Sequence, residues 1–175
     1  MLSIAPGTVD VTGPMPYPAI FDFTRDPTVS GYHYGRSTFV EDVPDAVVEA
    51  MLAHVERATS PLSFVQMRPL GGAFARVPSA ATAFANRDKR YMLSIINDWD
   101  GPNAEDGTVH RAWVNSLWHA VRPFGDGVYV NFLESGEGER IQQAYPGDTY
   151  ARLGAIKRRW DPDNFFRLNQ NIRPD

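Results

Sequence analysis

The order of the expected elements predicts an α+β fold: an antiparallel sheet with helices on one face, in the split βαβ arrangement of ferredoxin-like domains. Between residues 32 and 133, segments rich in β-branched and aromatic residues alternate with segments whose apolar residues recur at helical spacing. Apart from a short strand at residues 73–77, they run in the order strand, helix, strand, strand, helix, strand. A length of 175 residues and a hydrophobic content of 43% suffice for one sizeable core. A carboxy-terminal helix and an extended tail are expected to follow the sheet.

Residues 1–30 are expected to form an extended wrapper, because they are rich in proline and glycine and proline disfavours helix at the residue before it. Its apolar residues would lie against the rest of the chain or a partner; they are Tyr17, Ile20, Phe21 and Phe23. Residues 31–134 then form the sheet domain. Residues 135–175 form the carboxy-terminal helix and tail, in one globular unit with the sheet domain.

The first half of the sheet domain begins with a strand at residues 32–40. Pro44 suits the first turn of a helix that should end near Thr59, before Pro61. Residues 62–70 are expected to form the next strand. The apolar stripe of the helix comprises Val43, Val47, Ala50, Met51, Val55 and Ala58.

In the second half, a glycine pair at residues 71–72 predicts a turn into a short strand at residues 73–77. Further strands are expected at residues 91–96 and 127–133, with a helix between them that Pro123 stops. The apolar stripe of that helix comprises Val109, Ala112, Trp113, Leu117, Ala120 and Val121.

The last helix is expected to begin at Asp148 or Thr149, either of which can cap it, and to end at Pro162. Its buried stripe would comprise Tyr150, Leu153, Ile156 and Trp160. The basic run at residues 157–159 lies at the end of this helix, where cations complement the helix dipole. With helices on one sheet face only, the other face would be covered by the wrapper, a second copy or another domain.

Composition excludes several classes of function. A net charge of −4 with scattered basic residues argues against nucleic-acid binding. The absence of cysteine excludes disulfides, thiolate nucleophiles and zinc-thiolate sites. No apolar stretch approaches the roughly 20 residues that a membrane span needs. We therefore expect a soluble, cytoplasmic protein without a membrane partner.

Motifs for phosphate loops, dinucleotide binding, zinc proteases and serine hydrolases do not occur. The histidines form no local ligand pair, so no metal site is expected; they are His33, His54, His110 and His119. Asp98 and Asp100 flank Trp99 and could point into one site, although turn-forming aspartates are the more common case. The glutamates at positions 134, 137 and 139 are most simply a solvated acidic turn.

The segment at residues 127–133 holds the most suggestive polar pair. As a strand, it would place Tyr129 and Asn131 on one sheet face, where a phenol and an amide could bind polar atoms. Periodicity alone favours an edge strand in which Tyr129 is half-buried and Asn131 faces water.

Several separated motifs together resemble the substrate domain and tail of the berberine-bridge-enzyme-like flavoprotein oxidases. The resemblance runs from about residue 13 to the end and is strongest in the tail at residues 161–167, Asp-Pro-Asp-Asn-Phe-Phe-Arg. The other motifs are Tyr-Val-Asn-Phe at residues 129–132, Gly-Gly-Ala at 71–73 followed by Ala-Thr-Ala-Phe at 81–84 and Arg87, and Arg-Ser-x-Phe at 36–39.

The resemblance implies hydride transfer from alcohols, sugars, amines or alkaloids to FAD, which dioxygen reoxidises. In that family a separate amino-terminal domain holds most of the FAD, and the substrate domain covers the open face of the flavin. The flavin-contacting residues would then be Tyr129 and Asn131, with Asn169 and, less directly, Asn171 near the domain junction. Tyr129 would also be a candidate catalytic residue. The candidate substrate-binding residues are His33, Tyr34, Arg36 and Phe132.

Two departures from the family pattern bear on the chemistry. Many members that oxidise hydroxyl groups have a tyrosine base where this chain has Phe132, and residues 79–81 offer no carboxylate in its place. An alcohol loses a proton with its hydride, whereas a neutral amine can be oxidised without a base. The donor is therefore either amine-like or an alcohol deprotonated by another group, with Tyr129, Tyr34 and His33 as candidates.

No flavin-binding domain is recognised in the 175 residues, so FAD is expected to be held by a domain encoded elsewhere. The chain would be inactive without it. Its expected partners are that domain, or a second copy of the chain through the open sheet face, together with a small-molecule substrate. The alternative function is a non-catalytic ligand-binding or dimerisation module with the same fold.

Overall fold

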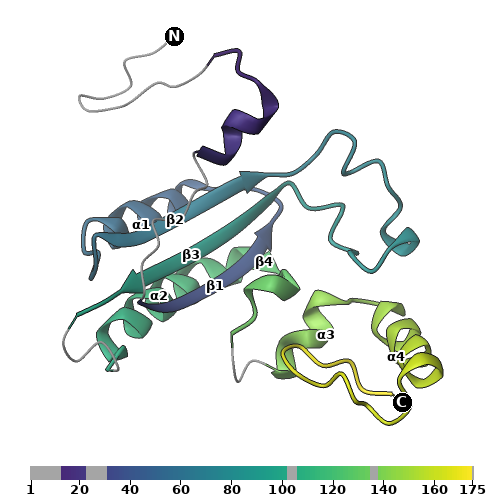
Figure 1. Ribbon diagram of the computed structural model, residues 1–175. Helices are drawn as coiled ribbons and strands as arrows, with labels where there is room; N and C mark the ends of the chain where they lie inside the picture. The colour runs from purple at the N-terminus through teal and green to yellow at the C-terminus, as the bar shows by residue number, and fades with distance from the viewer. Residues whose placement is uncertain (1–12, 23–30, 102–105, 135–137, 175) are drawn as a thin grey trace. The chain divides into compact units, whose positions relative to one another are not determined.

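A computed structural model describes residues 13–22, 31–101, 106–134 and 138–174, in two units that comprise residues 1–30 and 31–175 (Figure 1). Within the first unit, Tyr17–Asp22 forms a 3-10 helix (η1), and the rings of Tyr17 and Phe21 meet edge to face with centroids 6.2 Å apart. The expectation of an extended chain is wrong for these residues, because Pro18 is compatible with a first helical turn. Phe23 lies outside the described residues.

The second unit is built on a four-stranded antiparallel sheet in the order β2-β3-β1-β4. The strands are β1 (Tyr32–Val40), β2 (Leu62–Pro69), β3 (Tyr91–Trp99) and β4 (Gly125–Asp126). Helix α1 (Asp45–Val55) follows β1, and helix α2 (Thr108–Val121) follows β3. The predicted α+β class and split βαβ order are confirmed.

Both long helices lie on the same side of the sheet, as Figure 1 shows, and the main core lies between the layers. The core comprises Tyr34, Val47, Leu93, Ile95, Trp99, Trp113, Val114, Leu117, Trp118 and Val121. The buried side of α2 is turned from the predicted stripe, since Val109, Ala112 and Ala120 are exposed. Val114 and Trp118, which the predicted stripe did not include, are buried in their place. Trp113 is buried as predicted, and its Nε1 donates to the His54 carbonyl at 2.8 Å.

Two predicted strands are wrong. Residues 73–77 form turns, followed by the 3-10 helix η2 (Ser79–Ala81). After α2 and the 3-10 helix η3 (Arg122–Phe124), only Gly125 and Asp126 pair with β1. Gly127 then takes a positive φ of 65°, which turns the chain off the sheet edge, and Val130–Phe132 forms the 3-10 helix η4.

The carboxy-terminal part contains η5 (Gly138–Arg140), α3 (Ile141–Ala144), α4 (Thr149–Trp160) and the tail. It has its own small core of Val128, Leu133, Ile141 and Ala144, against which Val130, Tyr145, Tyr150 and Ile172 pack.

The predicted buried stripe of α4 is wrong at its end, where Ile156 is 54% and Trp160 is 74% exposed. Asp148 occupies the N-cap position without a side-chain capping bond. In the described ranges, no helix combines the length and apolar character needed to cross a membrane.

Candidate functional site

The sheet face opposite the helices carries the candidate site. Tyr34 belongs to the core, so alternation along β1 places His33, Gly35, Ser37 and Phe39 on the open face. Ser37 pairs in register with Ser94 of β3, and both residues are fully buried with hydroxyls that have no hydrogen-bond partner. This part of the face is therefore shielded from solvent.

An aromatic cluster lies over this face and includes residues from η4. Its members are Phe39, Phe74, Phe84, Tyr129 and Phe132, with neighbouring ring centroids 5.2 to 5.9 Å apart. The guanidinium of Arg68, from the open face of β2, lies 5.1 Å from the centroid of the Phe132 ring. These contacts hold η4 against the sheet.

Tyr129 and Asn131 were expected side by side on a strand face, free to bind other polar atoms, but in the structure they hydrogen-bond each other. The Asn131 amide nitrogen donates to the Tyr129 hydroxyl at 2.9 Å. The expected strand alternation does not exist here, because a 3-10 turn brings the two side chains together. The Tyr129 hydroxyl can still donate its own proton to another acceptor.

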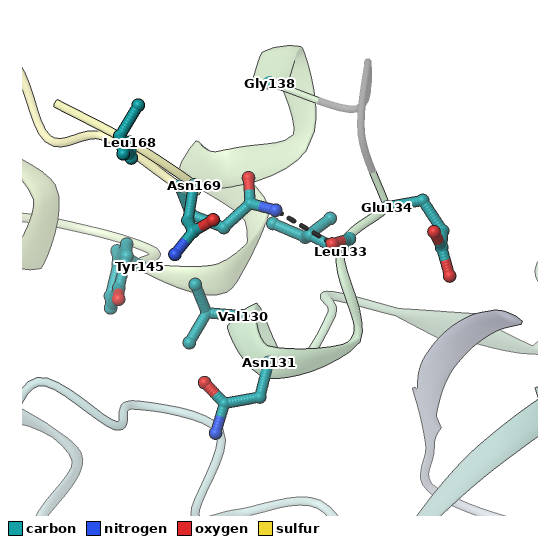
Figure 2. Close-up of a pocket in the computed structure, with 9 residues that line it drawn as sticks. Val130, Asn131, Leu133, Glu134, Gly138, Tyr145, Leu168 and Asn169 are labelled. Atoms are coloured by element: carbon teal, nitrogen blue, oxygen red, sulfur yellow. Dashed lines mark hydrogen bonds between the residues drawn. The ribbon is translucent and has the colours of Figure 1, made fainter. Parts of the chain in front are cut away.

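A pocket of about 1000 Å³ lies between η4, the residues around α3 and the tail (Figure 2). Its lining comprises Val130, Asn131, Leu133, Glu134, Gly138, Tyr145, Leu168, Asn169 and Gln170. The Gln170 amide donates to the Leu133 carbonyl at 2.8 Å, the dashed line in Figure 2, and so ties the tail to the segment after η4. Asn169 has a positive φ of 59°, a left-handed conformation that asparagine tolerates better than most residues.

Tyr145 is a pocket residue that the sequence reasoning missed. Burial raises the pKa of its phenol, and the nearby Tyr129 adds to the effect in the same direction. Tyr145 therefore stays protonated at neutral pH and can donate a hydrogen bond. No local motif marks it, because its place in the site depends on how α3 packs on η4.

A second polar group lies at the end of β1, where His33 is opposite Asp98 of β3. The His33 Nδ1 is 2.5 Å from the Asp98 carboxylate, and its Nε2 is 3.7 Å from the Glu134 carboxylate. Glu134 in turn accepts a hydrogen bond from the Gly35 backbone N–H at 2.9 Å. In Figure 2 its side chain points away from Asn169 and Tyr145.

Asp98 and Glu134 were expected in solvated turns, and those expectations are wrong. Asp98 lies within β3, and Glu134 is bound to the backbone of β1. Only the β1–β3 register could have revealed the pairing of His33 with Asp98.

Two of the predicted substrate-binding residues lie on the helix side of the sheet. Tyr34 is buried and donates to the Asn115 side chain at 3.2 Å. The Arg36 guanidinium lies 4.4 Å from the centroid of the Trp118 ring, and its Nε donates to the Tyr34 hydroxyl at 3.2 Å. Neither residue is among those that line the pocket.

The remaining histidines lie on or beside the two long helices, away from the pocket. His54 bonds to the Ala50 carbonyl at 2.7 Å, His110 stacks on Trp99, and His119 lies beside Trp118. Among the residues that the structure describes, no group of three or more histidine or acidic side chains is placed to hold a metal ion.

The pocket lies within a segment that matches a known family. Residues 128–173 match the model of the family described as "Berberine and berberine like". This segment contains η4, α3, α4 and the tail. The chain is related to the berberine bridge enzyme-like proteins. The resemblance found in the sequence motifs is thereby confirmed.

Two curated relatives illustrate the match. The "Uncharacterized FAD-linked oxidoreductase YvdP" of Bacillus subtilis (strain 168) is 30% identical over 136 residues, which cover 78% of this chain and 29% of that protein. Berberine bridge enzyme-like 22 of Arabidopsis thaliana is 27% identical over 161 residues, which cover 82% of this chain and 30% of that protein. The chain thus spans less than a third of the length of these relatives.

The fold is also shared with a solved structure. Berberine bridge enzyme from Eschscholzia californica superimposes with a TM-score of 0.73 at 20% identity, over 85% of this chain and 34% of that enzyme. At this identity the likeness shows the fold alone.

Proposed function

We propose that this chain is the donor-binding, carboxy-terminal part of an FAD-dependent oxidase. It would bind a small organic donor beside a flavin held by another region, so that a hydride passes from the donor to the flavin and dioxygen reoxidises the flavin. The observation that carries this proposal is the polar pocket next to the open sheet face. Its lining belongs largely to the segment that matches the family model.

Two residues of the pocket and Tyr129, which is bonded to one of them, suit the polar edge of a flavin ring. Amide side chains of Asn131 and Asn169 can both donate and accept hydrogen bonds, and the Tyr129 hydroxyl keeps a free proton to donate. These three residues would contact the ring, which supplies the two-electron chemistry that side chains lack. The sequence has no glycine-rich phosphate loop for the rest of the cofactor.

The surface of the carboxy-terminal part supports a partner domain. Large apolar side chains are exposed there, namely Trp160, Phe165, Phe166 and Leu168, at 74 to 85%. Apolar patches of this kind mark surfaces that another protein part covers. We infer that a flavin-binding domain covers this surface and lies beside the pocket.

Within the site, this chain's own residues have separable roles. Phe132 has no atom that can accept a proton, and its ring is held by Tyr129 and Arg68, so it would form an apolar wall. The Tyr129 hydroxyl already accepts a hydrogen bond from Asn131 and is better suited to donate than to abstract a proton. Tyr145 remains protonated and would orient polar atoms of the donor.

Absorbance spectroscopy tests the proposal. The 175-residue chain mixed with FAD alone is expected to give no stoichiometric yellow complex. The chain is next mixed with an FAD-loaded flavin-binding region from the Bacillus subtilis relative, prepared without its carboxy-terminal part. A shift in the visible flavin spectrum is expected, and Asn131→Ala should weaken it. A flavin complex of the chain alone, or self-association of the chain with no response to the flavin region, would contradict the proposal.

A further inference from the structure

The cluster of His33, Asp98 and Glu134 has no role in the proposal above, yet three separate elements bring it together. His33 comes from β1, Asp98 from β3, and Glu134 from the segment after η4. The side chain of His33 is 53% exposed, whereas those of Asp98 and Glu134 are 29% and 22% exposed. The carboxylates are held in place while the imidazole stays accessible.

We propose that His33 is the proton acceptor in the oxidation of a hydroxyl-bearing donor, with Asp98 as a positioning residue. This inference rests on the proposed oxidase function and deepens it by naming the donor class and the base. It would supply the group that Phe132, lacking a proton-accepting atom, cannot provide.

The hydrogen bond to Asp98 selects the useful tautomer of His33. A carboxylate accepts but does not donate, so at 2.5 Å it requires the proton of a neutral imidazole on Nδ1. The lone pair is then on Nε2, the atom on the side of Glu134. This is the arrangement of a histidine general base oriented by a carboxylate.

Glu134 is placed to face the positive charge that forms once Nε2 gains a proton. Its Oε1 lies 3.7 Å from Nε2, beyond direct hydrogen-bond range, and is fixed by the Gly35 N–H. The resulting imidazolium would lie between two carboxylates, with Asp98 facing it from β3 and Glu134 from the segment after η4. Glu134 also lines the pocket, so the cluster and the pocket share a wall.

Gly35 keeps the approach to Nε2 open. A Cβ atom at this position would lie 3.4 Å from the His33 Nε2. This is ordinary van der Waals contact, so only a side chain that extends beyond Cβ would crowd the atom that must receive the proton.

The proton and electron balance is complete with a flavin as the oxidant. The donor's C–H bond breaks and its two electrons leave with the hydrogen as hydride to the flavin. The O–H proton moves to Nε2 of His33, and the carbon–oxygen single bond becomes a carbonyl. An amine donor oxidised as the free base would not need this step.

NMR on the 175-residue chain tests the tautomer of His33 and requires no enzymatic activity. Long-range ¹H–¹⁵N spectra of the imidazole rings should show neutral His33 with its proton on Nδ1. In Asp98→Ala the fraction with the proton on Nδ1 should fall, while the signals of the distant His119 stay unchanged. A wild-type His33 that carries its proton on Nε2 would overturn the proposal.

Anaerobic stopped-flow on the complex of this chain with the FAD-loaded flavin-binding region tests the chemistry. With an alcohol donor, His33→Gln should reduce the rate of flavin reduction by about 100-fold or more and abolish the low-pH limb of the wild-type profile. His119→Gln should behave as wild type. If wild type reduces its flavin and His33→Gln keeps both rate and pH profile, the proton-acceptor role is wrong while the oxidase function stands. If wild type never reduces its flavin with any donor, the proton-acceptor role and the oxidase function are both wrong.

Discussion

Replacing Gly125 by alanine should detach β4 from the sheet, and with it the start of the segment that builds the pocket. A Cβ atom at Gly125 would lie 2.4 Å from the Phe39 carbonyl oxygen and 2.8 Å from the Thr38 hydroxyl. A carbon normally approaches a carbonyl oxygen to about 3.3 Å, so the strands would have to separate by roughly 1 Å. β4 pairs through only two residues, which leaves little ladder to absorb the shift.

The cost can be estimated from two terms. Overpacking against a rigid neighbour costs about 1–3 kcal/mol, and each backbone hydrogen bond lost from β4 adds about 0.5–1.5 kcal/mol. We therefore expect Gly125→Ala to lower the free energy of unfolding by about 2–4 kcal/mol. Denaturant unfolding followed by circular dichroism measures this change.

Gly138→Ala is the matched control, because a Cβ atom there meets nothing within 4 Å and the backbone φ is not positive. Its effect should stay within about 0.5 kcal/mol. Equal unfolding midpoints for the two variants would show that β4 does not fix the pocket segment to the sheet.

Three further substitutions test the core, the tail and the site one at a time. Leu117→Ala removes a fully buried side chain and should cost about 2–5 kcal/mol in thermal or denaturant unfolding, whereas Val109→Ala, at 60% exposed, should be nearly neutral. The hydrogen bond from Lys157 lowers the pKa of Asp161, and the backbone N–H groups of the following tail residues add to this against the opposing effect of burial. Because the folded pKa is depressed, this stabilisation is present at neutral pH and is lost as pH falls below about 4, through the folded pKa. In wild type, hydrogen exchange of the Phe166 amide should speed up over the same pH range. In Asp161→Asn this pH-dependent change should be absent, and its persistence would contradict the assignment. In the complex with the FAD-loaded flavin-binding region, Phe132→Tyr should alter the pH dependence of flavin reduction by adding a second base. An unchanged profile would count against the role assigned to Phe132.

The main sheet could be predicted from sequence because its signals are local. β1 has both of its predicted ends, since a run of β-branched and aromatic residues there stops at a turn before a helix. The 127–133 segment misled the same reasoning. Its apolar residues alternate like a strand, yet Val128 and Val130 pack into the small core and Gly127 turns the chain away at positive φ.

The site was only partly predictable because it depends on contacts between distant residues. A motif singled out Tyr129 and Asn131, but the hydrogen bond between them was not predicted, because it depends on a 3-10 turn where a strand was expected. The pocket forms because Gln170 of the tail binds the Leu133 carbonyl, 37 positions earlier in the chain. The pairing of His33 with Asp98 depends on strand register, for which a single sequence gives no direct signal.

The central claim is that the pocket and the open sheet face form the flavin-facing side of this chain. ¹H–¹⁵N NMR of the labelled chain, titrated with an FAD-loaded flavin-binding region, tests it most directly. We predict that the backbone or side-chain amide signals of Tyr129, Asn131 and Asn169 shift or broaden, while those of Leu52, exposed on helix α1, stay in place. Changes confined to the helix layer, with the pocket signals unmoved at saturation, would contradict the account.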